Sequence, residues 1–247
     1  MTEPGHFRPP TAAQIERRFR SPAVIATRPV VLGSIGVLRA ARSVAWRSVG
    51  LDHLAALDEP LVLAANHQSH VDTAAILGTL PRSMRERTAV AAALDVFGRS
   101  GNGSMPSLKR EFLQLLVAAG FHAFAFDRHG PPLRSVRTAA ELVRKGWSLL
   151  IYPEGTRSRT GQMAPFKAGV GLLARFTRRP VVPVYVEGGP SVLPCRAFLP
   201  RPGRMVVRYG SPLRYRPGET PGGFAARLQD AVRGLEGRSD RELRVVS

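Results

Sequence analysis

From residue 61 onward, short apolar runs alternate with segments of helical periodicity, and this alternation limits the fold more than any other feature. Several runs are apolar throughout, which is typical of parallel strands covered by helices on both faces. We predict strands at residues 61–65, 88–93, 122–126, 147–152, 181–186 and 205–209. We predict helices at residues 73–80, 107–119, 133–145, 166–177 and 223–235. The predicted fold class is α/β, with a largely parallel central sheet flanked by helices and an N-terminal helical segment.

The N-terminal part differs in composition from the rest of the chain. We expect residues 1–50 to form a basic, amphipathic helical segment and residues 51–247 to form the main domain. Residues 29–49 combine aliphatic residues and Trp46 with arginines. These arginines recur too often for a transmembrane span, which needs ~20 mostly apolar residues. Such a segment suits a helix at a membrane interface or, alternatively, a helix packed on the main domain.

The net charge of +18 is carried almost entirely by arginine, because Lys109, Lys145 and Lys167 are the only lysines. A surplus of this size suits an anionic partner, such as a lipid headgroup, an acidic carrier protein or nucleic acid. We expect no nucleic acid, because the arginines are scattered and no recognised binding module is present. The single cysteine, Cys195, excludes an intramolecular disulfide, so we expect a reducing, cytoplasmic compartment.

A histidine lies where the first predicted strand gives way to a helix. The strand ends before Asn66-His67, and helical periodicity begins after Asp72. Ser69 and Asp72 have the spacing of a capping box, in which their side chains would satisfy amides of the first helical turn. Asp72 could also accept a hydrogen bond from the His67 ring. The carboxylate would then fix the tautomer and stabilise the imidazolium, as a general base requires.

Other polar residues follow strands whose ends should share this edge of the sheet, which is where ligands bind in such folds. They are Asp127 and Arg128 after one strand and Glu154, Gly155, Thr156 and Arg157 after another. The guanidinium groups of Arg128 and Arg157 suit a phosphate, because each offers paired donors. Glu154 could orient Arg157 or accept a hydrogen bond from a substrate hydroxyl. With so many arginines in the chain, the alternative is that both are solvated surface residues.

Two imidazoles and a carboxylate in one turn also permit a metal site. His67, His70 and Asp72 could bind zinc, although no fourth ligand is evident nearby. We favour the general-base interpretation of His67 and Asp72. We expect His70 to be a structural residue or to lie at the rim of the site.

Four blocks of residues, in order, resemble the glycerophospholipid acyltransferases, of which 1-acyl-sn-glycerol-3-phosphate (lysophosphatidate) acyltransferase is the typical member. The match spans residues 61–188. The blocks are Asn66-His67 to Asp72 (N-H-x-S-x-x-D), Phe126-Asp127-Arg128, Tyr152 to Ser158 ([FY]-P-E-G-T-R-S) followed by Phe166-Lys167-Ala168-Gly169, and Val182-Pro183-Val184 with Gly188. The second block is matched loosely, since Ala123 and Ala125 replace the commoner glycine and β-branched residues. This departure leaves the identity of the acceptor open.

The resemblance implies that residues 51–247 are an acyltransferase domain that moves a fatty acyl group from acyl-CoA or acyl-carrier protein to a hydroxyl. His67 would be the general base and Asp72 would hold it. The acceptor, most simply 1-acyl-sn-glycerol-3-phosphate, would be bound by Arg128, Glu154, Gly155, Thr156 and Arg157, with Lys167 a further candidate. Cys195 is not expected to be a nucleophile. No metal or organic cofactor is implied.

Other interpretations lead to different expectations about activity and partners. The acceptor could be another lipid or a glycolipid, and the same base could serve a thioester hydrolase. A non-catalytic, basic membrane-binding module of the same fold would bind lipid without releasing a thiol. We expect an anionic membrane surface as a partner and a cytoplasmic, peripheral position on the inner face of the cell membrane.

Overall fold

A seven-stranded sheet lies at the centre of the molecule. In the computed structural model, which describes residues 10–93, 119–126, 132–158, 161–194, 197 and 199–239, the strand order is β1-β7-β6-β2-β5-β3-β4. All neighbouring strands are parallel except β6 and β7. The predicted α/β fold with a largely parallel sheet is therefore confirmed. The strands are β1 Val44–Val49, β2 Val62–Ala65, β3 Thr88–Ala93, β4 Ala123–Phe126, β5 Ser148–Ile151, β6 Val181–Glu187 and β7 Gly203–Tyr209.

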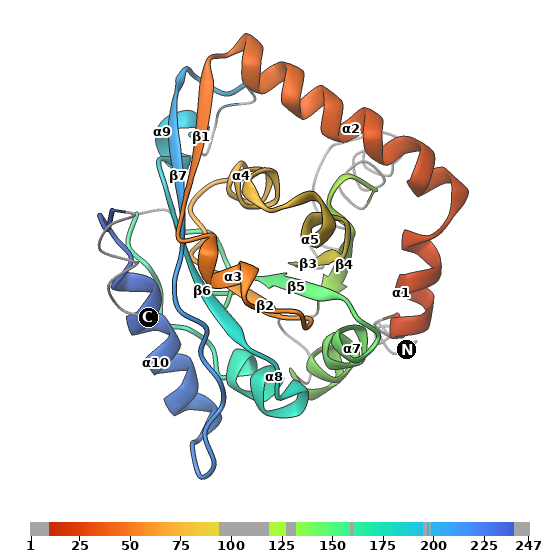
Figure 1. The fold of residues 1–247 in the computed structure, drawn as a ribbon, viewed down its shortest axis with the longest axis vertical. Coiled ribbons are helices and arrows are strands. Elements are labelled where there is room, and N and C mark those ends of the chain that lie inside the picture. Colours follow the sequence, from red (N-terminus) through yellow and green to blue (C-terminus); the bar gives the residue numbers. More distant parts are fainter. Residues whose placement is uncertain are drawn as a thin grey trace, which may run out of the picture.

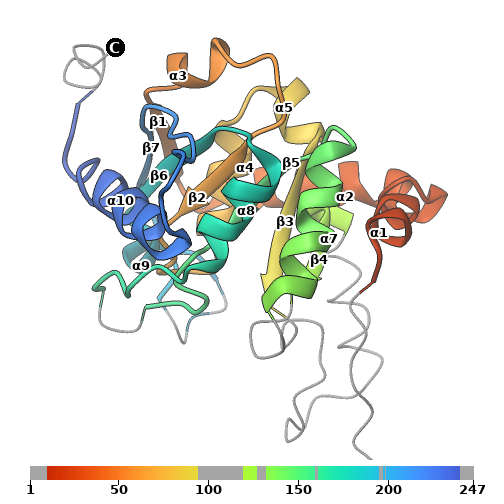
Figure 2. The same ribbon diagram turned by 90° about the horizontal axis from the view of Figure 1, so that it is seen from below.

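Helices cover both faces of this sheet (Figures 1 and 2). In Figure 1, α7, α8 and α10 lie below the central strands and α4 lies above them. The helices are α1 Ala12–Phe19, α2 Pro22–Ala41, α3 Asp52–Ala55, α4 Asp72–Thr79, α5 Arg82–Glu86, α7 Pro132–Arg144, α8 Gly169–Thr177, α9 Gly189–Val192 and α10 Pro221–Arg233.

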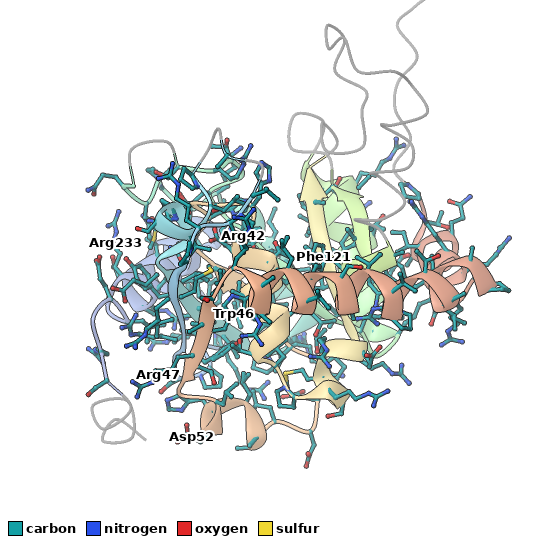
Figure 3. The ribbon with its side chains drawn as sticks, turned by 90° about the horizontal axis from the view of Figure 1, so that it is seen from above. Arg42, Trp46, Arg47, Asp52, Phe121 and Arg233 are labelled. Atoms are coloured by element: carbon teal, nitrogen blue, oxygen red, sulfur yellow. The ribbon has the colours of Figure 1, made fainter. Side chains whose placement is uncertain are left out.

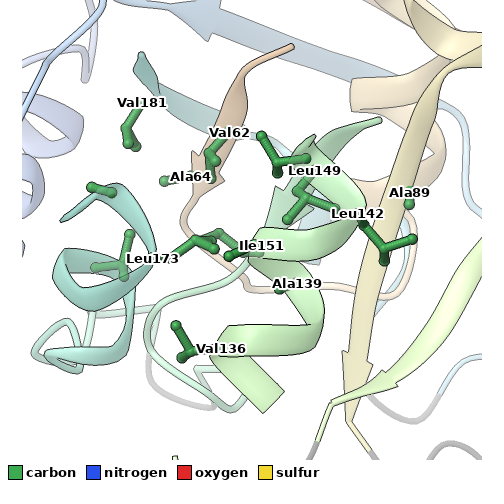
Figure 4. Packing of buried hydrophobic residues seen from close by; sticks show 14 of the residues in the cluster. Val62, Ala64, Ala89, Val136, Ala139, Leu142, Leu149, Ile151, Leu173 and Val181 are labelled. Atoms are coloured by element: carbon green, nitrogen blue, oxygen red, sulfur yellow. The ribbon is translucent and has the colours of Figure 1, made fainter. Parts of the chain in front are cut away.

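Strand β2 shows why these runs are apolar. Its four residues are all buried, and alternate side chains enter different cores. Val62 and Ala64 belong to the cluster that packs against α7 and α8 (Figure 4), whereas Leu63 and Ala65 belong to the cluster on the other face. Because successive side chains of a strand point to opposite faces, a strand covered on both sides needs an unbroken apolar sequence.

The first helix is part of the main core. It begins with a capping box, in which the Gln14 N–H donates to Thr11 Oγ1 at 3.3 Å and the Thr11 N–H donates to Gln14 Oε1 at 2.9 Å. Ala12, Ile15 and Phe19 form its buried stripe and join the same cluster as α7. Helix α1 therefore fixes the start of the described chain against the domain.

Helix α2 crosses the front of the molecule in Figure 3 and is mostly exposed. Its buried residues are Val24 and Arg28. Arg28 Nη1 donates to Glu86 Oε2 at 2.5 Å and lies 3.3 Å from His122 Nε2. Among the described residues, α2 is the one helix whose length and composition would allow it to cross a membrane.

Residues 44–49 correct the prediction of one helix over residues 29–49. They form β1, which pairs in parallel with β7. The chain leaves α2 through Ser43, whose φ of 51° is in the left-handed region. Trp46, which we expected either at a membrane interface or packed on the main domain, packs on α4: a Cβ added to Gly78 would lie 2.2 Å from its ring. The guanidinium carbon of Arg39 lies 5.1 Å from the centroid of the same ring.

The remaining predicted elements correspond to β2 to β7, α4, α7, α8 and α10, with ends that differ by at most three residues. The helix predicted at residues 107–119 lies almost wholly outside the described residues. The division of the chain at residue 50 stays a prediction, although α1 and β1 contribute to the core and the sheet of the main domain.

Candidate active site

The turn after β2 is set by a buried asparagine. Asn66 is 1% exposed, and its side chain forms two hydrogen bonds with the main chain of Val186 in β6. Its Nδ2 donates to the Val186 carbonyl at 3.0 Å, and its Oδ1 accepts from the Val186 N–H at 2.7 Å. The side chain thus extends the pairing of β2 with β6 by one step. The main chain is left free to turn out of the sheet at His67.

His67 and Asp72 meet in this turn, as the sequence predicts. His67 Nδ1 lies 3.1 Å from Asp72 Oδ2, and the two side chains are 18% and 1% exposed. Asp72 Oδ2 also accepts hydrogen bonds from the N–H groups of Gln68 and Ser69, at 2.8 and 2.7 Å. An ionised carboxylate oxygen can only accept hydrogen bonds, so Nδ1 of His67 carries the proton. In the neutral ring, Nε2 of His67 is therefore left as an acceptor.

Ser69 does not cap the helix, which corrects one half of the predicted capping box. The N-cap of α4 is Val71, which makes no side-chain hydrogen bond to the helix. The Ser69 hydroxyl instead donates to the Leu193 carbonyl at 2.8 Å, just after α9. Asp72 does accept a hydrogen bond from the Ser69 N–H. Its carboxylate therefore both closes the turn and holds the His67 ring.

The ring of His67 is also supported on one face. It stacks on Tyr152, with ring centroids 3.9 Å apart and an angle of 17° between the planes. The Tyr152 hydroxyl lies 2.7 Å from Thr73 Oγ1 in α4. Burial and the nearby charge of Asp72 raise the pKa of Tyr152 well above its usual value, so the phenol stays neutral. Contacts on the edge and on the face together fix the orientation of the imidazole.

The main chain of His67 is held by the segment that follows β5. Glu154 Oε1 accepts from the His67 N–H at 2.8 Å, and Ser158 N–H donates to the His67 carbonyl at 2.8 Å. Glu154 Oε2 accepts from the Ala164 N–H at 2.9 Å. Burial raises the pKa of Glu154, and these two amides oppose that shift. The carboxylate is thus shared between two main-chain donors, and its predicted contact with an acceptor stays a prediction.

Gly155 and Lys167 lie together beside this segment. Gly155 has a φ of 75°, in the region that favours glycine. A Cβ at this position would lie 2.8 Å from Lys167 Nζ, so the ammonium group covers the turn. Thr156 is exposed.

Arg157 contacts His70, which we expected to be a structural residue or to lie at the rim of the site. Arg157 Nη1 lies 2.5 Å from His70 Nε2, and the guanidinium must be the donor because it has no acceptor atom. Burial and the charge of Arg157 lower the pKa of His70, which favours the neutral, accepting ring. His67, Asp72, Glu154, Gly155 and Arg157 are therefore brought together by the fold.

Arg128 and Cys195 lie outside the described residues. Within the part of the chain that the structure describes, no group of three or more His, Cys, Asp or Glu side chains could hold a metal ion. His70 Nε2 faces Arg157, a cation, so this nitrogen does not point into a common ligand set with His67 and Asp72.

The arrangement defines an α/β protein with a braced histidine at the carboxyl edge of a parallel sheet, geometry that can remove a proton from a hydroxyl. The family model described as Acyltransferase matches residues 46–187, and the chain belongs to this family.

Curated relatives support the same assignment. A 1-acyl-sn-glycerol-3-phosphate acyltransferase of Bacillus subtilis is 29% identical over 157 residues, which cover 63% of this chain and 68% of that protein. The protein of that name from Cocos nucifera is 29% identical over 160 residues, which cover 62% of this chain and 46% of the relative. The chain spans less than half the length of the plant relatives it matches first.

A solved structure shares the fold. The crystal structure of the 1-acyl-sn-glycerophosphate (LPA) acyltransferase PlsC from Thermotoga maritima aligns with a TM-score of 0.60. The alignment covers 91% of this chain and 88% of that chain at 21% sequence identity. At this identity the likeness is one of fold.

Proposed function

We propose that this protein transfers a fatty acyl group from a thioester to the free hydroxyl of a lysophospholipid, most simply 1-acyl-sn-glycerol-3-phosphate, giving phosphatidate. The observation that carries the proposal is His67, whose ring is braced by Asp72 and whose main chain is held by Glu154. The names of the relatives from several organisms point to the same reaction.

In the proposed reaction, Nε2 of His67 takes the proton of the hydroxyl as its oxygen attacks the thioester carbonyl carbon. The tetrahedral intermediate then collapses, and the carbon–sulfur bond breaks. The thiolate leaves and takes the proton back from the imidazolium, so the histidine is regenerated. Asp72 stabilises the imidazolium while it exists, and base assistance of this kind is worth about 10²–10⁴-fold in rate. A thioester is already activated, so this step needs no metal or organic cofactor.

The acceptor's phosphate would bind beside the histidine. Arg157 supports this proposal, because its guanidinium lies next to His70, three residues from His67 in the same turn. A guanidinium offers a phosphate two parallel donors and keeps its charge at any physiological pH. Arg128, Gly155 and Thr156 complete the predicted acceptor site, in which the clamp would hold the hydroxyl within reach of Nε2.

We further infer that the protein meets its lipid substrate at an anionic membrane surface. Exposed apolar side chains on α2 support this inference: Ile25, Val30 and Val37 are 61%, 67% and 70% exposed. Apolar side chains of this kind partition into the interface, and arginines of a +18 chain add attraction to anionic headgroups. The location that we propose is peripheral, on the inner face of the cell membrane. The acyl donor, acyl-CoA or acyl-carrier protein, would be attracted by the same charge.

The test uses the purified full chain with lysophosphatidate in anionic vesicles and either acyl-CoA or acylated carrier protein. Thiol release and phosphatidate formation are measured together. We expect His67→Ala to lose both activities while the circular dichroism spectrum and the unfolding midpoint stay close to those of the parent. His53→Ala is the matched control, because His53 lies on α3, which precedes β2, whereas the His67 turn follows that strand.

The outcomes separate the alternatives. Thiol release that does not depend on the acceptor indicates a thioester hydrolase, and release with a glycolipid or another lysolipid indicates a different acceptor. Vesicle binding without any thiol release indicates a non-catalytic membrane module. Full turnover by His67→Ala contradicts the proposed mechanism.

A further inference from the structure

One oxygen of the Asp72 carboxylate lacks a hydrogen bond. Asp72 Oδ2 accepts from three donors, whereas Oδ1 is buried and has no partner among the described residues. An unpaired, buried carboxylate oxygen is costly and therefore uncommon. The carboxylate is nonetheless held in this orientation, so the surroundings of Oδ1 must leave room for it without bonding to it.

That room is provided by a glycine at the start of α9. A Cβ added to Gly189 would lie 2.3 Å from Asp72 Oδ1 and 3.0 Å from Ser69 Cβ. The first distance is far below any van der Waals contact, so an alanine at this position would require a displacement. The position tolerates only a hydrogen atom while Asp72 keeps its present orientation.

The main chain around Gly189 has little freedom to move away. Gly188, just before it, has a φ of 88°, and a Cβ there would lie 2.3 Å from the Arg204 carbonyl oxygen in β7. Val192, at the other end of α9, is fully buried in the core. The Leu193 carbonyl accepts the Ser69 hydroxyl. The carboxylate, which turns about a single side-chain bond, is therefore the group that would yield.

We propose that Gly189 is a positioning residue that acts through Asp72 on the proton-accepting state of His67. Its missing side chain lets the carboxylate present Oδ2 to the imidazole and to two amides at once. A methyl group at position 189 would rotate the carboxylate, and His67 would lose the partner that fixes its tautomer. The catalytic consequence rests on the acyl transfer proposed above, but the effect on the imidazole does not.

The experiment compares Gly189→Ala with two other glycine-to-alanine variants. Gly222→Ala adds its methyl group to open space, and Gly171→Ala brings one within 2.1 Å of the Pro221 carbonyl oxygen, between α8 and α10. We expect Gly189→Ala to lower kcat about 100-fold with little change in KM, as small misplacements of a reacting group do. The two controls should keep the parent's kcat per folded molecule, although Gly171→Ala should unfold earlier.

A second readout observes the histidine directly. ¹⁵N spectra of labelled protein, with the His67 signals assigned by their loss in His67→Gln, report which ring nitrogen carries the proton. We expect the parent to show the Nδ1–H form and Gly189→Ala to show a mixture of tautomers. An unchanged His67 spectrum and an unchanged kcat in a folded Gly189→Ala protein would overturn the proposal. If the parent lacks acyltransferase activity, the spectra still decide the question.

A third variant covers the case in which Gly189→Ala does not fold. Asp72→Ala removes the oxygen that the new methyl group would strike. We therefore expect Asp72→Ala/Gly189→Ala to recover a cooperative unfolding transition close to that of Asp72→Ala alone. If the double variant is as unfolded as Gly189→Ala, the conflict lies elsewhere than at Asp72 and the proposal is wrong.

Discussion

The turn that carries His67 and the helix α2 are built in opposite ways. In the turn, side chains bond to main-chain groups: Asn66 bonds to β6, Asp72 to two amides, and Glu154 to the His67 N–H. Along α2, most side chains are at least partly exposed, and the helix is attached mainly through Val24 and Arg28. The turn has one geometry that the sheet enforces, whereas α2 presents an apolar surface to its surroundings.

The proposed chemistry and the proposed membrane contact therefore depend on separate parts of the molecule. The geometry of His67 is set by contacts with β6 and with the segment after β5, and none of those contacts comes from α2. Variants of the turn should change turnover without changing lipid binding. Variants of α2 should weaken lipid binding and leave turnover unchanged at saturating vesicle concentrations.

Among the variants that keep His67, removal of the Asp72 carboxylate should have the largest effect. We expect Asp72→Ala to lower kcat by about 10²–10⁴-fold, the range of general-base assistance. Asp72→Asn should lose less, because the amides of Gln68 and Ser69 need an acceptor and will select the oxygen of the asparagine. The tautomer then survives and only the charge is lost. Equal losses in the two variants, measured by thiol release, contradict this separation of orientation from charge.

The sequence predicts much of the sheet because its strands are buried on both faces. Four consecutive apolar residues such as those of β2 leave little other choice. Strand β1 was missed for a local reason. It follows an apolar helix directly, contains Arg47 among its exposed positions, and is separated from α2 by Ser43 at positive φ. No glycine or proline marks that change of structure, so the pattern indicates one continuous helix.

The contacts of the site likewise fall into those that the sequence predicts and those that it does not. The contact between His67 and Asp72 spans five positions and could be predicted from their spacing. The contacts of Glu154 with His67 and of Arg157 with His70 each join residues 87 positions apart. Such pairs depend on how the ends of β2 and β5 lie beside each other, which the spacing of residues within one motif does not report. Gly189 is recognised only by what an added side chain would strike.

Charges on the exposed face of α2 should weaken lipid binding. Val30 and Val37 are the most exposed of its large apolar residues. Full burial of a valine is worth about 1.5 kcal/mol or more, so Val30→Glu/Val37→Glu should weaken binding to anionic vesicles about 100-fold. Leu133→Glu, at an exposed apolar position on α7, is the control. Vesicle flotation measures the effect, and undiminished binding by the α2 variant would show that this helix is not the contact.

The attachment of α2 to the domain should depend on one arginine. Arg28 is 6% exposed and bonds to Glu86, with His122 and the Gly120 carbonyl nearby. We expect Arg28→Met to lower the free energy of unfolding by about 2 kcal/mol, since it leaves buried acceptors without their charged donor. Arg20→Met, which removes an exposed ion pair with Glu16, should cost less than about 1 kcal/mol. Urea unfolding of both variants measures these two losses of unfolding free energy.

The contact between Arg28 and His122 should also make stability depend on pH. Burial, followed by the charge of Arg28, lowers the pKa of His122 from 6.5 to about 3. Between these values the unfolded chain binds a proton that the folded protein does not, so stability falls as the pH falls through the unfolded pKa. From about pH 7.5 to about pH 5.5, His122 alone should remove about 1.4 kcal/mol from the free energy of unfolding.

His122→Asn isolates this contribution. Asparagine tolerates the positive φ of 48° at this position and does not titrate, while every other ionisable group is shared with the parent. The parent should therefore lose more stability on acidification than the variant, and the difference between the two urea curves should grow as the pH falls. Parallel pH profiles would mean that His122 has the same pKa in the folded and the unfolded protein. In that case Arg28 could not lie beside it as a charged neighbour, and α2 would be attached by other contacts.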